Sequence, residues 1–287
     1  MNKIKVSELF YSIQGEGRYM GVPSVFLRTF GCNFRCKNFN RKLQDIPAGE
    51  KINPEVEQVI KNIGNYKTLK DLPLVRTGCD SYNSIYPEFK KYAINDSIDG
   101  IVDAILRLLP HGKWTSEHLV ITGGEPLLGW QKAYPTLLSH SGMVDLQELT
   151  FETNGTQELI PEFSEYLKTH WRKGWDRLTF SISPKLSVSG ERWEDAIKPE
   201  IVLQYEEHGY AYLKFVVANE FDVAEAEMAV ECYRDHGFKG PVYLMPVGGV
   251  ESVYAMNNKN VALMAMKKGW RYSDRLQVPL FKNEWGT

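Results

Sequence analysis

Short apolar runs alternate along this chain with segments of helical periodicity, and this alternation constrains the fold more than any other feature. Two segments, residues 98–109 and 221–236, repeat apolar side chains at the three- and four-residue spacing of a helix. Six apolar, β-rich runs predict strands, at residues 24–30, 119–122, 149–153, 178–183, 212–217 and 242–245. Such alternation is typical of a parallel sheet with crossover helices, which keeps its active site at the carboxyl ends of the strands. We therefore predict an α/β fold with a site at that edge.

Three of the predicted strands run directly into polar sequences that contain glycine or proline. These sequences are TGGEP at residues 122–126, ETNGT at residues 152–156 and SPK at residues 183–185. Any one of them alone is consistent with an ordinary turn. Three in succession, each at the end of a strand, predict that they face one shared site.

The chain has 287 residues, which suits one large α/β domain with an insertion, or two small domains; we expect a single domain over residues 1–287. The net charge of −2 gives no overall field for nucleic acid or for an anionic membrane. No apolar run approaches the roughly 20 residues of a membrane-spanning helix, and the first residues contain no apolar signal segment. We expect a cytoplasmic protein without membrane or direct nucleic-acid contacts.

Residues 37–78 break the alternation and predict an insertion. This segment is polar, with eight Lys or Arg against five Asp or Glu, a basic excess that we assign to a solvated face. It contains one plausible short helix, with Asn53 as the cap and Pro54 in the first turn.

The four cysteines are too few, and too unevenly placed, for a disulfide framework in a chain of this length. Cys32 and Cys36 lie in the sequence GCNFRC just after a predicted strand, and thiolates are the usual ligands of iron–sulfur clusters. Two unrelated cysteines are the alternative on spacing alone. Cys232 lies in a helical segment, where we predict a buried side chain that binds no metal.

The Cys-x-x-x-Cys sequence followed later by Gly-Gly-Glu-Pro resembles the radical S-adenosylmethionine (SAM) superfamily. The blocks YSIQGEG at residues 11–17 and GVPSVFLR at residues 21–28 are more specific. With residues 122–128, 152–156 and 183–185 in the same order, they resemble the 7-carboxy-7-deazaguanine synthase family. The resemblance covers nearly the whole chain except the insertion.

This resemblance implies a partial (β/α)6 radical SAM barrel with an insertion in the cluster-binding loop. It implies conversion of 6-carboxy-5,6,7,8-tetrahydropterin to 7-carboxy-7-deazaguanine with loss of ammonia, in queuosine-type 7-deazapurine biosynthesis. The cofactors would be a 4Fe-4S cluster, S-adenosyl-L-methionine and Mg²⁺. The partners would be an electron donor, such as flavodoxin or ferredoxin, and a second copy in a homodimer.

The resemblance also implies the cluster ligands. Cys32 and Cys36 would be the first two, but Phe39 stands where the superfamily has its third cysteine. Cys79-Asp80-Ser81 resembles the Cys-Asp-Thr of the family, so Cys79 would be the third ligand, displaced by the insertion. Ser81 would replace the threonine whose hydroxyl binds magnesium, and serine keeps that hard oxygen ligand.

The remaining site residues follow position by position from the same resemblance. Arg28 would bind the substrate carboxylate, and Glu16 would accept from the amino and ring NH groups of the pterin. Two departures are Pro279 and Phe281, where Gln and His are common, and a third is Met245, where Gln is usual. SAM would be bound by Asp80, Gly123, Gly124, Glu125, Ser183, Pro184, Lys185 and Met245, and substrate by Ile13, Gln14, Gly15, Glu16, Arg28 and Thr122.

Two alternatives stay open at this point. One is a radical SAM activase that installs a glycyl radical on a partner protein. The other is a non-catalytic binding protein of the same fold, which Phe39 and the altered tail would permit. Whether the product serves tRNA or DNA modification also stays open.

Overall fold

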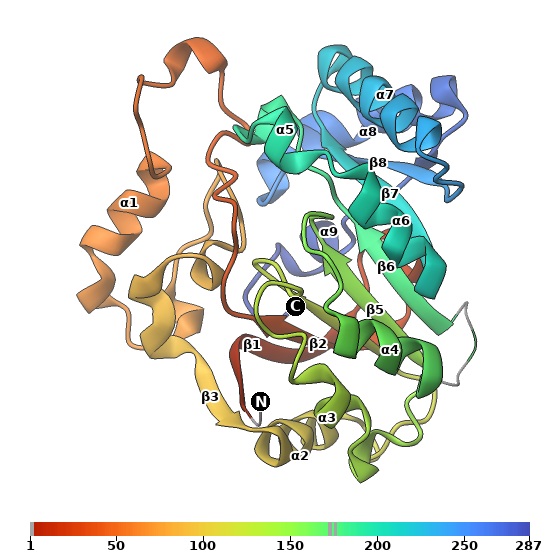
Figure 1. Ribbon diagram of the computed structural model, residues 1–287. Helices are drawn as coiled ribbons and strands as arrows, with labels where there is room; N and C mark the ends of the chain where they lie inside the picture. Colours follow the sequence, from red (N-terminus) through yellow and green to blue (C-terminus); the bar gives the residue numbers. More distant parts are fainter. Residues whose placement is uncertain (1–2, 172–173, 175–176) are drawn as a thin grey trace.

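The computed structural model describes residues 3–171, 174 and 177–287, which form one nine-stranded sheet (Figure 1). The strand order is β3-β1-β2-β4-β5-β6-β7-β8-β9, so β3 and β9 lie at the two edges. Strands β2 and β4 to β9 are parallel, while β1 pairs antiparallel with both β2 and β3. The strands are β1 (Lys3–Ile13), β2 (Pro23–Thr29), β3 (Ile94–Ser97), β4 (His118–Gly123), β5 (Glu148–Thr153), β6 (Leu178–Ile182), β7 (Tyr210–Val217), β8 (Val242–Pro246) and β9 (Arg271–Tyr272).

The six predicted strands correspond to β2, β4, β5, β6, β7 and β8, and the predicted α/β class is confirmed. The prediction missed β1 and β3, which pair antiparallel with each other, and the two-residue edge strand β9. Among the described residues, no helix has both the length and the apolar character to cross a membrane.

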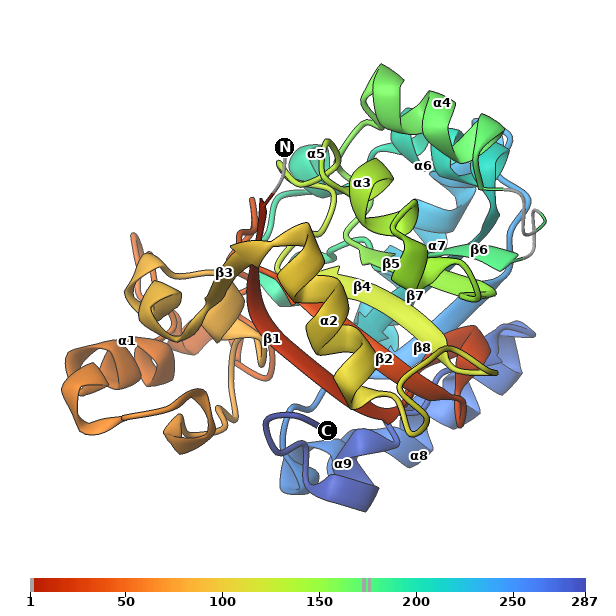
Figure 2. The ribbon, with the colours of Figure 1, turned by 90° about the horizontal axis from the view of Figure 1, so that it is seen from below.

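Helices pack along one face of the curved sheet, where α2, α3, α4 and α6 follow one another (Figures 1 and 2). The predicted helix over residues 98–109 is α2, whose cap Ser97 accepts a hydrogen bond from the Gly100 NH at 3.2 Å. The prediction for residues 221–236 is likewise confirmed by α7. The helices are α1 (Pro54–Lys61), α2 (Ile98–Leu108), α3 (Tyr134–Leu138), α4 (Pro161–Thr169), α5 (Trp193–Ala196), α6 (Pro199–His208), α7 (Glu220–Asp235), α8 (Glu251–Lys268) and α9 (Gln277–Phe281).

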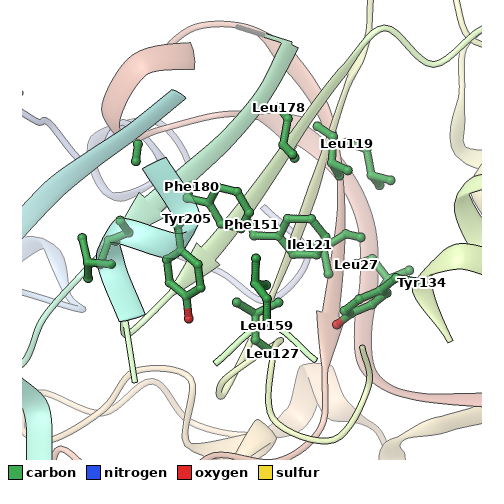
Figure 3. Close-up of a cluster of buried hydrophobic side chains, with 14 of the residues drawn as sticks. Leu27, Leu119, Ile121, Leu127, Tyr134, Phe151, Leu159, Leu178, Phe180 and Tyr205 are labelled. Atoms are coloured by element: carbon green, nitrogen blue, oxygen red, sulfur yellow. The ribbon is translucent and has the colours of Figure 1, made fainter. Parts of the chain in front are cut away.

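Aromatic side chains between the sheet and these helices fix the positions of the central strands (Figure 3). Phe151 on β5 stacks on Phe180 on β6, with ring centroids 5.7 Å apart, and Phe180 stacks on Tyr205 of α6 at 4.8 Å. All three are fully buried, so their burial and stacking hold neighbouring strands in one register. The carboxyl ends of β4, β5 and β6 are therefore held side by side.

Residues 37–78, the predicted insertion, carry the predicted helix, α1, and contribute to a second apolar cluster. Asn53 caps α1 by accepting from the Glu55 NH at 2.9 Å, and its amide donates to Lys37 O and Thr77 Oγ1. The insertion thus has its own helix cap but shares its apolar cluster with the residues that precede and follow it. The cluster joins insertion residues Val56, Val59, Leu72 and Val75 to Phe30, Tyr82, Ile85, Tyr86 and Phe89.

Candidate active site

A cavity of about 250 Å³ opens at the carboxyl ends of the parallel strands. Residues after β4, β5 and β6 all contribute to its wall, as do the cysteine loop and the C-terminal tail over residues 283–287. The prediction that these strand ends share one site is confirmed. The predicted residues that line the cavity are Ile13, Gln14, Gly15, Glu16, Arg28, Cys32, Cys36, Cys79, Asp80, Ser81, Thr122, Gly123, Gly124, Ser183, Lys185 and Met245.

Two predicted residues, Glu125 and Pro184, lie outside the cavity lining. Glu125 is fully buried and accepts from the Leu127 NH at 3.0 Å, from Thr153 Oγ1 at 2.8 Å and from the Asn154 NH at 2.6 Å. Its carboxyl group thus ties the end of β4 to the end of β5. Burial raises the pKa of this carboxyl to about 7.

The first two cysteines lie in a tight loop after β2. The Glu191 carboxylate fixes the loop by accepting from the NH groups of Arg35 at 2.9 Å and Cys36 at 2.7 Å. Gly124 packs directly on the loop, because a Cβ there would lie 2.3 Å from Gly31 O and 2.6 Å from Cys32 Cβ. Only glycine allows this approach of the Gly-Gly-Glu-Pro turn to the cysteine loop.

The third cysteine returns to the same place because the insertion closes at its base. The Gly78 NH donates to Phe39 O at 2.9 Å, and the Asn40 amide donates to Arg76 O at 3.0 Å. Cys79 therefore follows a residue that is bonded to position 39. Its side chain packs in one apolar cluster with Cys32, Cys36, Phe34 and Phe39.

The three thiols are free; Cys36 is buried, Cys32 and Cys79 are half-buried, and all three resist ionisation. Burial raises the pKa of Cys32 and of Cys79 to about 12 and that of Cys36 well above its ordinary value, while the Lys185 cation partly opposes each rise. Within the described residues, no three Cys, His, Asp or Glu side chains stand as a group that could hold a metal ion. Each thiolate of a four-iron cluster binds a different iron, so its ligands stand farther apart than those of one ion. Three free thiols that face one cavity are consistent with such a cluster.

At the other end of the cavity, buried charges are paired with one another. The Glu16 carboxylate accepts from Lys214 Nζ at 2.5 Å through Oε2, and from Arg275 Nε at 3.2 Å through Oε1. Arg275 also donates to Asp80 Oδ2 at 2.5 Å and to Gly248 O. Burial opposes ionisation of Glu16, but the Lys214 and Arg275 cations outweigh it and lower the Glu16 pKa to about 2.

Arg28 lies between two side chains of the protein. Its Nε donates to Glu8 Oε2 at 3.1 Å and its Nη1 donates to Ser81 Oγ at 2.9 Å. Among the described residues these bonds leave the Nη2 donors of Arg28 for a ligand. Burial raises the pKa of Glu8 in spite of the Arg28 charge.

Sequence reasoning missed several residues of the wall. Lys214 is a lysine in the middle of an otherwise apolar strand, and that contrast was the signal that could have revealed it. In the tail, Gln277 lines the cavity, whereas Pro279 and Phe281 do not. Trp285 also lines the cavity, and its ring NH donates to Leu72 O of the insertion at 2.8 Å.

The burial of Cys232 differs from the prediction, while its position away from the cavity agrees with it. It lies on α7 and outside the cavity lining, but it is half-buried rather than buried, because it packs only partly against the main core.

Comparisons with known proteins agree with the resemblance carried by the motifs. No protein-family model matches the chain. The 7-carboxy-7-deazaguanine synthase of Pyrobaculum aerophilum is 27% identical, over 99% of this chain and 97% of its own length. The synthase of Halobacterium salinarum is 28% identical over 98% of this chain and 91% of its own length. The synthase of Rhodopirellula baltica is 27% identical over 100% of this chain and 90% of its own length. Among solved structures, QueE from Escherichia coli has a TM-score of 0.54 at 19% identity and covers 94% of this chain and 93% of its own. The predicted radical SAM fold is thus confirmed, and the resemblance extends over nearly the whole chain.

Proposed function

We propose that this protein, which resembles the 7-carboxy-7-deazaguanine synthases along nearly its whole length, converts 6-carboxy-5,6,7,8-tetrahydropterin to 7-carboxy-7-deazaguanine with loss of ammonia. The observation that carries the proposal is a single cavity with three free thiols at one end and paired charges at the other. The names of the relatives support the activity and the cofactors expected from the sequence. The product would enter queuosine-type 7-deazapurine biosynthesis.

Cys32, Cys36 and Cys79 would hold the 4Fe-4S cluster. The chemistry that the cluster and SAM supply when bound is hydrogen abstraction from C6 of the pterin. The thiols must lose their protons to bind iron, which their raised pKa values oppose. Lys185 would assist, because its ammonium group is held in place by Ser183 O at 2.8 Å and favours the thiolate forms.

Four cavity residues would contact SAM directly: Gly123 and Gly124 through their backbone, Ser183 at the end of β6, and Met245 by packing on adenine. Asp80 would contribute its backbone. Glu125 and Pro184 would act indirectly, by fixing the turns after β4 and β6 from outside the lining.

Arg28 would bind the substrate carboxylate through its remaining donors, and Ser81 would be the protein ligand of Mg²⁺. Since Arg28 donates to Ser81 Oγ, this bond would yield when the ion and the carboxylate enter. Thr122 and the turn over residues 13–16 would complete the wall around the pterin, and Glu16 would accept from its NH groups. These residues position the substrate and keep water from the reacting carbon.

The wider setting of the enzyme is part of the same proposal. Four free cysteines and an oxygen-sensitive cluster favour a reducing, cytoplasmic compartment. The electron would come from a donor such as flavodoxin or ferredoxin, and the enzyme would act as a homodimer. The chain would be a single radical SAM domain, with residues 37–78 as the insertion in its cluster-binding loop.

An anaerobic assay tests the proposal. Protein reconstituted with iron and sulfide is incubated with 6-carboxytetrahydropterin, SAM, Mg²⁺ and dithionite, and the products are measured by mass spectrometry. We expect 7-carboxy-7-deazaguanine together with 5′-deoxyadenosine. SAM cleavage without any change in the pterin would contradict the substrate assignment and would favour the glycyl-radical activase alternative. Failure to bind iron would favour the alternative of a non-catalytic binding protein.

A further inference from the structure

Two side chains at the charged end of the cavity carry polar atoms that the protein leaves unused. Gln277 donates through Nε2 to Glu16 Oε1 at 2.9 Å, while its own Oε1 is buried and has no hydrogen-bond partner among the described residues. Lys214 is 5% exposed and its recorded hydrogen bond goes to Glu16 Oε2, which leaves two more ammonium protons. Both residues line the cavity, and neither was assigned a role by the sequence motifs.

Glu16 connects these two residues in a row. Its Oε1 accepts from both Gln277 and Arg275, which fills the lone pairs of that oxygen. Its Oε2 accepts from Lys214 and has one lone pair left. The unused groups along the row are therefore an acceptor on Gln277, an acceptor on Glu16 and a donor on Lys214.

The pyrimidinone edge of a pterin offers the complementary order of groups: an amino donor at C2, an NH donor at N3 and a carbonyl acceptor at C4. We infer that Gln277, Glu16 and Lys214 together recognise this 2-amino-4-oxopyrimidine edge, with Gln277 on the amino group and Lys214 on the carbonyl oxygen. The inference rests on the proposed function for the identity of the substrate. It makes Lys214 and Gln277 specificity-determining residues.

The packing of α9 favours this assignment. Gln277 begins α9 and lies directly over Gly15, where an added Cβ would be 1.8 Å from Gln277 Oε1. Gly15 thus allows the Gln277 amide to lie directly against the turn over residues 13–16, where both residues line the cavity. Pro279 and Phe281, which stand where the family commonly has Gln and His, lie outside the lining, whereas Gln277 brings a polar side chain to it.

Equilibrium binding to the cluster-reconstituted, full-length protein tests the inference without measuring turnover. The probes are 6-carboxypterin, a stable fluorescent analogue, and 6-carboxylumazine, in which an oxygen replaces the 2-amino group. For the wild type we expect a preference of about 10- to 100-fold for the pterin, because the lumazine sets a carbonyl oxygen against Gln277 Oε1. Gln277→Met should reduce this preference to less than about threefold. Lys214→Met should lower the affinity for both probes to the same extent, by about tenfold or more, because both probes carry the 4-oxo group.

Matched controls are Gln147→Met and Lys259→Met, both at exposed positions outside the cavity, which should bind both probes as the wild type does. Gln277→Met removes no charge, so it carries the test even if Lys214→Met fails to fold. Wild-type affinity and preference in both cavity variants would overturn this inference and leave the proposed function intact. A wild type that binds neither probe would overturn both.

Discussion

At the charged end of the cavity the carboxylates have cationic partners that keep them ionised, whereas at the cysteine end the nearby Lys185 cation does not offset the effect of burial on three thiols. Glu16 and Asp80 share Arg275, and the Glu16 pKa lies near 2. Cys32 and Cys79, at the other end, have pKa values near 12. Both sets of groups are buried to a similar degree, so the difference comes from their partners and not from the solvent.

This difference separates the part of the cavity that the polypeptide forms alone from the part that would need a cofactor to be complete. Paired carboxylates and cations fold into place together, because each charge lowers the cost of burying the other. Thiols whose burial outweighs a nearby cation stay neutral, and metal binding must drive their deprotonation. The charged end is therefore preorganised, while the cysteine end would be completed by the proposed cluster. Four predictions test this contrast.

The largest effect is expected at the cysteine end. Cys79→Ala leaves two thiolates for a four-iron cluster, so reconstituted iron content, visible absorbance and reductive SAM cleavage should all be lost. Cys232→Ala is the matched control, since that residue lies on α7 outside the cavity, and it should retain a full cluster. A complete cluster in Cys79→Ala, or iron loss in Cys232→Ala, would contradict the ligand assignment.

The next largest effect is expected at the charged end of the cavity, when the cation that Glu16 and Asp80 share is removed. Arg275→Met leaves the Glu16 and Asp80 carboxylates buried with too few cations, and it should destabilise the protein by about 3–5 kcal/mol in urea unfolding. Arg192→Met, which breaks an exposed ion pair with Asp195, should change the free energy of unfolding very little. Equal effects of the two substitutions would mean that the buried network is not preorganised.

Two buried carboxyl groups should give opposite pH dependences. The folded-state pKa of Glu16 is lowered to about 2 from 4.5, so its stabilising contribution is present above pH 4.5 and is lost as pH falls toward 2. The folded-state pKa of Glu125 is raised from 4.5 to about 7, so the folded state binds the extra proton and stability falls as pH rises between these values.

Glu125→Gln should remove that decline, which amounts to at most about 3 kcal/mol. Urea unfolding of both proteins from pH 4.5 to 7.5 measures it. Parallel pH profiles would show that Glu125 is ionised throughout.

The smallest of the four effects concerns the guanidinium group at the middle of the cavity. Arg28→Lys cannot satisfy Glu8, Ser81 and a substrate carboxylate at once, so pterin turnover should fall about 100-fold through a raised KM. SAM cleavage in the absence of pterin should persist, since it depends on the cysteine end. Loss of both to the same extent would indicate a structural role for Arg28.

The elements that could be predicted from sequence have a single strong local pattern. The buried parallel strands, the capped helix α2 and the Asn53 cap of α1 are of this kind. Strand β1 was missed because its register shifts between Val6 and Glu8, which interrupts the alternation of apolar and polar residues. Helix α8 was missed because apolar residues lie on both of its faces, for example buried Val261 and exposed Leu263.

The candidate site divides in the same way. Its glycines, cysteines and strand-end polar residues stand in short motifs, which the resemblance identified. Lys214 and Glu16 are 198 positions apart, and Arg275 and Glu16 are 259 apart. No local spacing predicts such pairs, since only the order of strands in the sheet brings them together. Phe39, which appeared to break the cluster motif, proved to be bonded through its carbonyl group to Gly78.

The backbone hydrogen bond from Gly78 to Phe39 closes the base of the loop between them, so the geometry of the cavity does not depend on the length of that loop. Forty-two residues lie between Cys36 and Cys79, yet the position of Cys79 depends on the closed base of the loop. Because the entropic cost of a loop grows only slowly with its length, residues can be gained or lost beyond the base with little strain on the site. The closed base thus allows the residues beyond it to change in length while the residues of the cavity keep their positions.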